Sequence, residues 1–302
     1  MVMNLTQLGK VSSGQGFVAA LDQSGGSTPN ALAKYGIPPS RYSSKQEMFD
    51  LVHAMRVRVI TSPAFDGRRI LAAILFEQTM ERNVHGVPTP QYLWDEKGVV
   101  PFLKVDKGLA EEQHGVRLMK PIDTLDALLE RANEHRIFGT KMRSVISDAD
   151  KDGVTAIVEQ QFDYAARISA AGLVPIIEPE VRTDSPHKDE SESLLCAALQ
   201  EHVEALPREG RILLKLTIPT QPGIYAELAT NSRVLRVLAL SGGYSRDKAC
   251  QLLAKDPSMI ASFSRALLEG LTDGQTDEQF NAQLEASIAQ IFAASVKNPP
   301  NS

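Results

Sequence analysis

The sequence predicts an α/β protein built as a single (β/α)8 TIM barrel, with an additional helix at the C-terminal end. Eight short apolar runs recur along the 302 residues, amphipathic helical patterns separate them, and no glycine- and serine-rich linker divides the chain. An open doubly wound sheet is the alternative, but no GxGxxG turn follows the first run to bind a dinucleotide. We expect one domain over residues 1–302, with a disordered tail from about residue 297.

The apolar runs have the composition of parallel strands that helices cover on both faces. They predict strands over residues 16–22, 70–76, 99–105, 137–143, 173–180, 212–217, 234–240 and 259–264. The helices between them have recognisable starts. Ser44 followed by Glu47, and Thr276 followed by Gln279, have the spacing of capping motifs. The second motif opens the additional C-terminal helix.

Composition excludes several classes of partner. The net charge of -5 comes from interspersed signs, so no basic stripe is available for a phosphate backbone, and nucleic acid is not an expected partner. No run approaches the roughly 18 apolar residues that span a bilayer, and the first residues lack the apolar core of a secretory signal. Cys196 and Cys250 sit in helical patterns and require no disulfide. We expect a soluble cytoplasmic protein with no membrane partner.

Charged residues stand at the ends of most predicted strands, where a barrel holds its active site. They are Asp22, Lys104, Asp106, Lys141, Arg143, Glu178, Glu180, Lys215 and Arg265. Any one of them alone is most simply a solvated charge at the rim of the sheet. Because side chains alternate along a strand, however, Lys141 shares a face with Arg143, and Glu178 with Glu180. The set therefore predicts one charged cavity.

Lys215 stands in the apolar string RILLKLTIP, where a lysine is costly to bury unless it is paired or neutral. A free lysine has a pKa of about 10.4, so a nucleophilic amine at neutral pH needs its charged form disfavoured by several units. Burial and nearby cations both have this effect, and Lys104, Lys141 and Arg143 are the candidate cations. Lys215 is therefore a candidate for forming a Schiff base with a ketone.

Dehydration of the first adduct needs a carboxyl group that can give and take protons. Glu178 is the candidate, with Glu180 or Asp22 as the second carboxylate. The resulting iminium draws electrons from the adjacent carbon-carbon bond, and that chemistry requires no cofactor. The six histidines show no HxxH, HxH or HExxH spacing and fall outside the strand ends, so we expect no metal site.

Two glycine-containing turns indicate anion sites at the same end of the barrel. Ser241, Gly242 and Gly243 follow the seventh predicted strand, and Arg265 follows the eighth. Although SGG alone is a common flexible turn, the loops after strands seven and eight are the usual phosphate site of a barrel. The second cluster comprises Gln23, Ser24, Gly25, Gly26, Ser27 and, further on, Lys34. Two such sites predict a phosphorylated sugar or triose as substrate.

Six strings occur in order between about residue 16 and residue 265: ALDQSGGS, PFLKVDKG, GLVPIIEPEV, LLKLTIPTQPG, LALSGGYS and SFSRAL. Together they resemble the class I fructose-bisphosphate aldolases. The resemblance implies a metal-independent enzyme of glycolysis and gluconeogenesis. Such an enzyme cleaves fructose 1,6-bisphosphate reversibly to dihydroxyacetone phosphate and glyceraldehyde 3-phosphate.

Carried over by position, the resemblance implies that Lys215 forms the imine, Glu178 is the general acid and base, and Asp22 handles the substrate hydroxyl proton. It implies supporting roles for Lys141 in dehydration, Glu180 in the carboxylate network and Lys104 in binding substrate oxygens. The implied ligands of one phosphate are Ser241, Gly242 and Arg265, and those nearer the other are Ser24, Ser27, Lys34 and Arg143.

The sequence departs from the animal and plant members at Gln23, which stands for a glutamate, and at Met142, which stands for a tryptophan. It also ends KNPPNS without their C-terminal tyrosine, so Tyr225, Tyr244 or a water molecule is a candidate replacement. The short form is similar to bacterial members, and a homo-oligomer is compatible with it. The alternatives are another lysine-imine barrel, such as a transaldolase, and a catalytically silent barrel that binds sugar phosphates or protein partners.

Overall fold

The computed structural model describes residues 4–23 and 28–296. Within them a ring of eight parallel strands closes through a pairing between β5 and β7. The strands are β1 (Phe17–Leu21), β2 (Ile70–Leu75), β5 (Val100–Lys104), β7 (Gly139–Ile146), β8 (Val174–Val181), β9 (Ile212–Thr217), β10 (Val234–Leu240) and β11 (Met259–Phe263). The predicted barrel is confirmed, although β7 runs three residues beyond its predicted end, where its tip pairs both with β8 and with β6 (Val116–Arg117).

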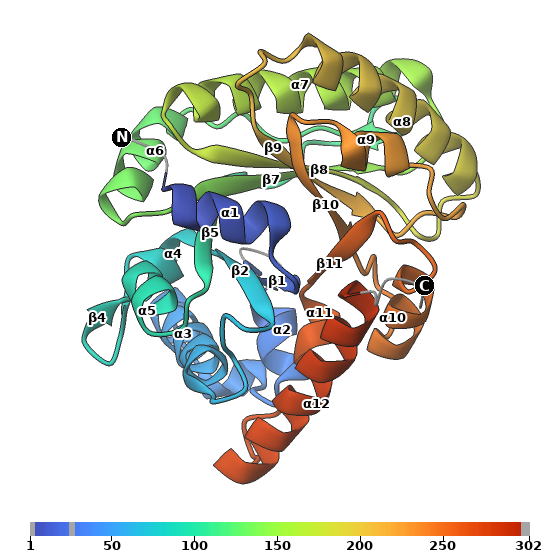
Figure 1. Ribbon diagram of the computed structural model, residues 1–302. Helices are drawn as coiled ribbons and strands as arrows, with labels where there is room; N and C mark the ends of the chain where they lie inside the picture. Colours follow the sequence, from blue (N-terminus) through green and yellow to red (C-terminus); the bar gives the residue numbers. More distant parts are fainter. Residues whose placement is uncertain (1–3, 24–27, 297–302) are drawn as a thin grey trace, which may run out of the picture.

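Helices follow the strands around the outside of the ring (Figure 1). They are α2 (Thr28–Lys34), α3 (Lys45–Thr61), α4 (Glu77–Met80), α5 (Thr89–Asp95), α6 (Leu125–Glu134), α7 (Lys151–Ala170), α8 (Lys188–Ala205), α9 (Ala226–Thr230), α10 (Arg246–Leu253), α11 (Arg265–Leu268) and α12 (Asp277–Ser295). A 3-10 turn (Pro39–Arg41) and a hairpin of β3 (Asn83–Val84) with β4 (Val87–Pro88) complete the described elements.

Both predicted capping motifs begin helices. The Ser44 side chain accepts a hydrogen bond from the Glu47 N–H at the start of α3, and Thr276 and Gln279 form a reciprocal capping box at the start of α12. The additional C-terminal helix is thereby confirmed. No helix within the described residues combines the length and the apolarity needed to cross a bilayer. The expected tail from residue 297 lies outside the described residues.

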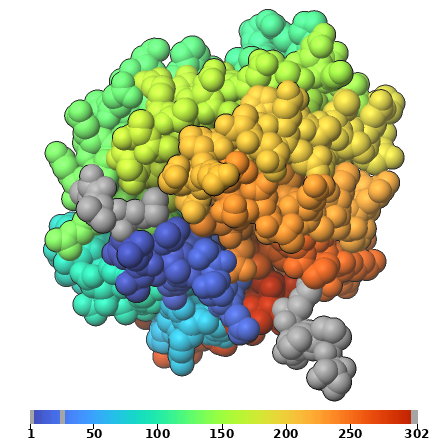
Figure 2. All heavy atoms as spheres, turned by 45° about the horizontal axis from the view of Figure 1, so that its top comes forward, coloured from blue at the N-terminus to red at the C-terminus, as the bar shows by residue number. Residues whose placement is uncertain are grey.

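A first helix, α1 (Leu5–Ser13), covers the amino-terminal end of the ring, a position that the strand pattern did not predict. It lies across the middle of the strands in Figure 1, and its blue surface sits between the green and orange segments in Figure 2. Val11 joins the apolar side chains that fill the barrel. Arg236 on β10 donates hydrogen bonds to the carbonyls of Val11 at 3.2 Å and Gly14 at 2.9 Å. The amino-terminal end is therefore closed, and the carboxyl-terminal end is left for a site.

Replacing Arg236 tests how firmly α1 is held. Arg236→Met removes two hydrogen bonds from a charged donor to the end of α1, so we expect it to lower the free energy of unfolding by about 1–3 kcal/mol. Urea denaturation measures the change. Arg68→Met is the control, since Arg68 pairs with Asp66 on the surface and is 85% exposed. Equal stability of the two variants would contradict an anchoring role.

Candidate active site

Four side chains meet inside the carboxyl-terminal end of the barrel and form what we call the lysine–carboxylate cluster. Lys141 Nζ lies 2.7 Å from Asp22 Oδ2 and 2.7 Å from Glu178 Oε2. Lys215 Nζ lies 2.9 Å from Glu178 Oε1. All four residues are buried, with Lys215 only 4% exposed. Glu178 therefore bridges two lysines.

Strand register brings the cluster together. Lys141 follows Gly139 on the inner face of β7, and Glu178 follows Val174 and Ile176 on the inner face of β8. The register pairs of β8 with β9 end at Ile177 with Leu214, one residue before Glu178 and Lys215. The two strands thus stop pairing where their functional side chains begin, which leaves those side chains room to face the cavity.

The electrostatics of the cluster favour its charged forms. Burial opposes the charge on Lys141, but the carboxylates of Asp22 and Glu178 outweigh burial and raise the lysine pKa. Burial likewise opposes ionisation of the two carboxyls, yet Lys141 and Lys215 hold the pKa of Asp22 and of Glu178 below the usual values. At neutral pH the cluster therefore contains an ammonium group flanked by two carboxylates.

One Glu178 oxygen contacts Lys141 without a well-aligned hydrogen bond. Glu178 Oε2 has no hydrogen-bond partner of good geometry among the described residues, although it is 2.7 Å from Lys141 Nζ. The contact is therefore ionic, and it leaves an oxygen lone pair that can accept or return a proton.

Two further ion pairs stand beside the cluster and hold the other predicted charges. Lys104 Nζ donates to Asp106 Oδ1 at 2.7 Å, and Lys104 is the register partner of Lys141. Arg143 Nε donates to Glu180 Oε2; burial opposes the charge of Arg143, but Glu180 outweighs it and raises the arginine pKa. The three cations expected around Lys215 thus have different partners. Lys141 belongs to the cluster, whereas Lys104 and Arg143 each pair with a carboxylate outside it.

The predicted phosphate turn lies next to Arg265. Gly242 and Gly243 have φ of 56° and 105°, and the Gly242 carbonyl accepts a hydrogen bond from Thr183 Oγ1 at 2.9 Å. A Cβ at Gly242 would stand 2.3 Å from Thr183 Cγ2, so the position requires glycine. A Cβ at Gly243 would be 3.6 Å from Arg265 Nη2, which places the exposed guanidinium over the turn that begins at the buried Ser241. The turn and Arg265 thus lie side by side, and their role in binding a phosphate stays a prediction.

The second predicted anion site is described only in part. Ser24 and Ser27 lie outside the described residues. Lys34 is exposed in the last turn of α2, and no ion pair within residues 4–23 and 28–296 joins it to the cluster. Gln23 ties the end of β1 to the end of β11, because its Nε2 donates to Ser264 Oγ at 2.6 Å.

Neither candidate tyrosine belongs to the cluster. Tyr225 is fully buried; burial raises its pKa well above the usual value, and its charged neighbours are Glu192 and Asp256. Tyr244 is half-buried, and its backbone N–H donates to the Ser241 carbonyl at 2.9 Å, so it closes the phosphate turn.

Three residues that sequence analysis missed support the site. Thr183 holds the phosphate turn, the buried Arg56 donates to the Gln23 carbonyl, and Gln161 accepts a hydrogen bond from the Glu178 N–H. A signal existed for Gln161, which lies seven residues after Val154 and directly before Phe162 on the apolar face of its helix. A glutamine on such a face indicates a specific hydrogen-bonding role.

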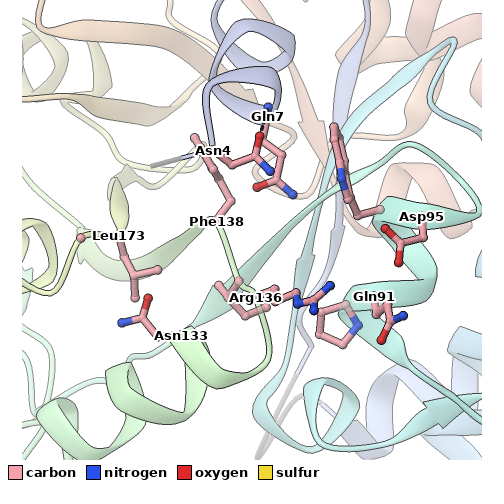
Figure 3. Close-up of a pocket in the computed structure, with 12 residues that line it drawn as sticks. Asn4, Gln7, Gln91, Asp95, Asn133, Arg136, Phe138 and Leu173 are labelled. Atoms are coloured by element: carbon pink, nitrogen blue, oxygen red, sulfur yellow. Dashed lines mark hydrogen bonds between the residues drawn. The ribbon is translucent and has the colours of Figure 1, made fainter. Parts of the chain in front are cut away.

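A cavity of about 360 Å³ lies at the opposite end of the barrel, between α1 and the starts of β7 and β8. Gln7, Trp94, Arg136, Phe138 and Leu173 are among its lining residues (Figure 3). No member of the lysine–carboxylate cluster lines it. The site is therefore located by its chemistry, the convergence of buried ionisable groups, and not by the size of a hollow.

The closed barrel and the buried lysine paired with a carboxylate at its carboxyl-terminal end define a barrel enzyme. The chain belongs to the class I fructose-bisphosphate aldolases, because the family model described as fructose-bisphosphate aldolase class-I matches residues 6–218. It is therefore a carbon-carbon lyase, and the predicted family is confirmed.

Solved structures agree with the fold. Fructose-bisphosphate aldolase from Plasmodium falciparum, solved in complex with TRAP and a small-molecule inhibitor, matches with a TM-score of 0.73 at 21% identity, over 97% of this chain and 95% of that chain. A Corynebacterium glutamicum protein matches with a TM-score of 0.52 at 13% identity, over 96% and 92%. At these identities both show the barrel architecture.

Removing Lys141 tests the electrostatics of the cluster. Lys141→Met leaves Asp22 and Glu178 without their shared cation, so we expect a loss of about 3–5 kcal/mol in the free energy of unfolding at neutral pH. Carboxyls with lowered pKa values contribute stability above the unfolded-state pKa of about 4, and that contribution is lost as pH falls through the folded value. Without Lys141 both pKa values rise, so the gap between variant and wild type should narrow as pH falls.

Denaturant unfolding between about pH 3 and pH 8, a window that contains the unfolded-state carboxyl pKa of about 4, measures the effect. Lys107→Met is the control, since Lys107 pairs with Glu77 and is 40% exposed. We expect the control to change stability by less than about 1 kcal/mol. A Lys141 variant whose deficit is independent of pH would refute the electrostatic account.

Proposed function

We propose that the chain cleaves fructose 1,6-bisphosphate reversibly through an imine on Lys215, without a metal ion or cofactor, as a cytoplasmic step of glycolysis and gluconeogenesis. The observation that carries the proposal is the 2.9 Å contact between Lys215 Nζ and Glu178 Oε1 in a buried cluster that also contains Lys141 and Asp22. Membership of the aldolase family supports the substrate.

Glu178 is placed to take the proton that the Lys215 amine must lose before it can attack a ketone. Moving a proton from Lys215 to Glu178 converts a buried ion pair into a neutral amine and a neutral acid, both of which burial favours. The neutral amine attacks the C2 ketone of the substrate and forms a carbinolamine. Glu178 then returns its proton to the carbinolamine hydroxyl, which leaves as water and gives the iminium.

The remaining members of the cluster fit the cleavage step. Asp22 accepts the proton of the C4 hydroxyl as the C3–C4 bond breaks, and the bonding electrons move to the iminium nitrogen. Glyceraldehyde 3-phosphate leaves, and an enamine of dihydroxyacetone phosphate stays on Lys215. Lys141 lies between Asp22 and Glu178 and keeps Asp22 ionised, so that it can act as the base.

Trapping with borohydride tests the nucleophile directly. Incubation with dihydroxyacetone phosphate followed by borohydride should add the reduced triose phosphate to Lys215, as peptide mass spectrometry can show. Lys215→Met should lose the adduct and lower kcat by about a thousandfold or more, because methionine has no amine to form the imine. Circular dichroism checks that the variant is folded.

Two outcomes distinguish the alternatives. Triose phosphate on a different lysine would reject Lys215 as the imine former, and folded wild type without turnover would favour a silent sugar-phosphate-binding barrel.

A coupled assay with and without EDTA tests the absence of a metal requirement, and we expect equal rates. Cleavage abolished by EDTA and restored by a divalent cation would contradict the proposal.

Arg265 is the proposed ligand of one substrate phosphate, together with the turn at Ser241, Gly242 and Gly243. Arg265→Met should raise KM for fructose 1,6-bisphosphate by about 10- to 100-fold, since a hydrogen bond from a charged donor is worth about 1.5–3 kcal/mol. Steady-state kinetics measure the change. Arg182→Met is the control, because Arg182 is already bound by Asp184 through two hydrogen bonds. An unchanged KM in the Arg265 variant would exclude the phosphate role.

A further inference from the structure

Gln161 is a buried amide on the outer side of the barrel wall, behind the lysine–carboxylate cluster. It is 0% exposed and lies on the face of α7 that covers β7 and β8 (Figure 1). Its Oε1 accepts a hydrogen bond from the Glu178 N–H at 2.8 Å, and its Nε2 donates to Ser144 Oγ at 3.0 Å. One helix side chain thus bonds both strands, at the residue that bridges the two lysines.

The neighbours of Gln161 make its polarity unusual. The other buried residues of α7 include Val154, Val158 and Phe162, and a polar group in such surroundings is costly unless it is hydrogen-bonded. An apolar side chain of similar length would pack there without that requirement. Strand β8 already pairs with β7 through the register of Arg143 with Glu178, so the glutamine is not needed merely to join the strands.

Glu178 lies in a part of β8 that pairs with β7 but no longer pairs with β9. The N–H of Val174 donates to Phe138 and that of Arg182 to Ile146, so the N–H groups of even-numbered β8 residues face β7. Odd-numbered residues then face β9, and one of them is Pro179, which has no N–H to donate. The pairs with β9 accordingly end at Ile177. Glu178 is therefore held mainly from the β7 side, where Gln161 bonds its N–H.

We propose that Gln161 is a positioning residue, which fixes the backbone of Glu178 so that its carboxylate stays aligned with Lys215 Nζ. Gln161 touches no reacting atom and acts only through Glu178. The inference rests on the proposed function, in which Glu178 transfers protons to and from the imine-forming amine and its adduct. Ser144 has a secondary part, because it orients the glutamine amide so that the oxygen faces Glu178.

The decisive variant is Gln161→Met, which keeps the length and removes both hydrogen bonds. We expect kcat to fall about tenfold with KM changed less than about twofold, since a displacement of about 1 Å at a reacting group can cost on the order of a hundredfold. The rate of borohydride-trappable imine formation should fall in parallel, while the final amount of adduct on Lys215 stays unchanged. If Gln161 had a merely structural role, the variant would have a lower melting temperature, but its turnover and its rate of imine formation, each per trapped site, would equal those of wild type.

The chain offers a matched control on the next residue. Gln160 is half-buried on α7 and makes two side-chain hydrogen bonds, both to the backbone of Met119, at 2.9 and 3.0 Å. Gln160→Met should lower thermal stability and leave kcat unchanged. Gln161→Glu should recover most of the lost rate, because a buried neutral acid still accepts from the Glu178 N–H and donates to Ser144.

The outcomes separate this inference from the proposed function. Suppose that wild type traps dihydroxyacetone phosphate on Lys215 and that Gln161→Met forms the imine and turns over at the wild-type rates. The positioning role is then wrong and the mechanism stands. If wild type itself traps nothing on Lys215, the proposed function fails first. A Gln160 variant that loses as much kcat as the Gln161 variant would also overturn the inference, since general loosening of α7 would then explain both.

Discussion

The candidate active site depends on charge balance among four buried side chains. Two lysines and two carboxylates occupy the interior of the barrel, where an isolated charge would be too costly to keep. Asp22, Glu178 and Lys141 are each held in the ionised form by their neighbours, and removal of any one of them would leave an uncompensated charge. Because Asp22 directly follows β1 and the other three lie on β7, β8 and β9, the balance exists only when the ring of strands is closed and in register.

The strands β8 and β9 supply Glu178 and Lys215, and the register pairs between these strands end just before those two residues. Pro179 interrupts the hydrogen bonds of β8 toward β9, directly after Glu178, and gives the two facing side chains space. Other groups compensate for the lost backbone bonds. Thr217 Oγ1 donates to the Val181 carbonyl at 2.6 Å on the β9 side, and Gln161 bonds Glu178 on the β7 side. Both compensating bonds reach β8 at or just after the bridging glutamate, one at Glu178 and the other at Val181.

Much of the fold could be predicted from the sequence, because buried parallel strands and amphipathic helices leave distinct periodic patterns. The convergence of Lys141, Glu178 and Lys215 was also predictable, since strand ends meet at one end of a barrel. Their pairing was not. Whether a lysine faces one carboxylate or two depends on strand register, which alternating polarity does not encode, and the capture of Arg143 by Glu180 is decided in the same way. The position of α1 depends on tertiary contacts such as those of Arg236, and local pattern cannot reveal them.

The same charge balance explains why position 23 is a neutral glutamine. Arg56 is fully buried behind the end of β1, and burial lowers its pKa to about 10, with Asp22 acting in the opposite direction. Arg56 donates hydrogen bonds to two neutral groups, the carbonyl of Gln23 and the hydroxyl of Thr79. The carboxylate of Asp22 therefore balances the charge of Arg56 in addition to that of Lys141. A glutamate at position 23 would offer Arg56 a competing anion. Glutamine keeps Asp22 as the sole carboxylate at the end of β1, and its amide instead links that strand to Ser264, the residue before Arg265.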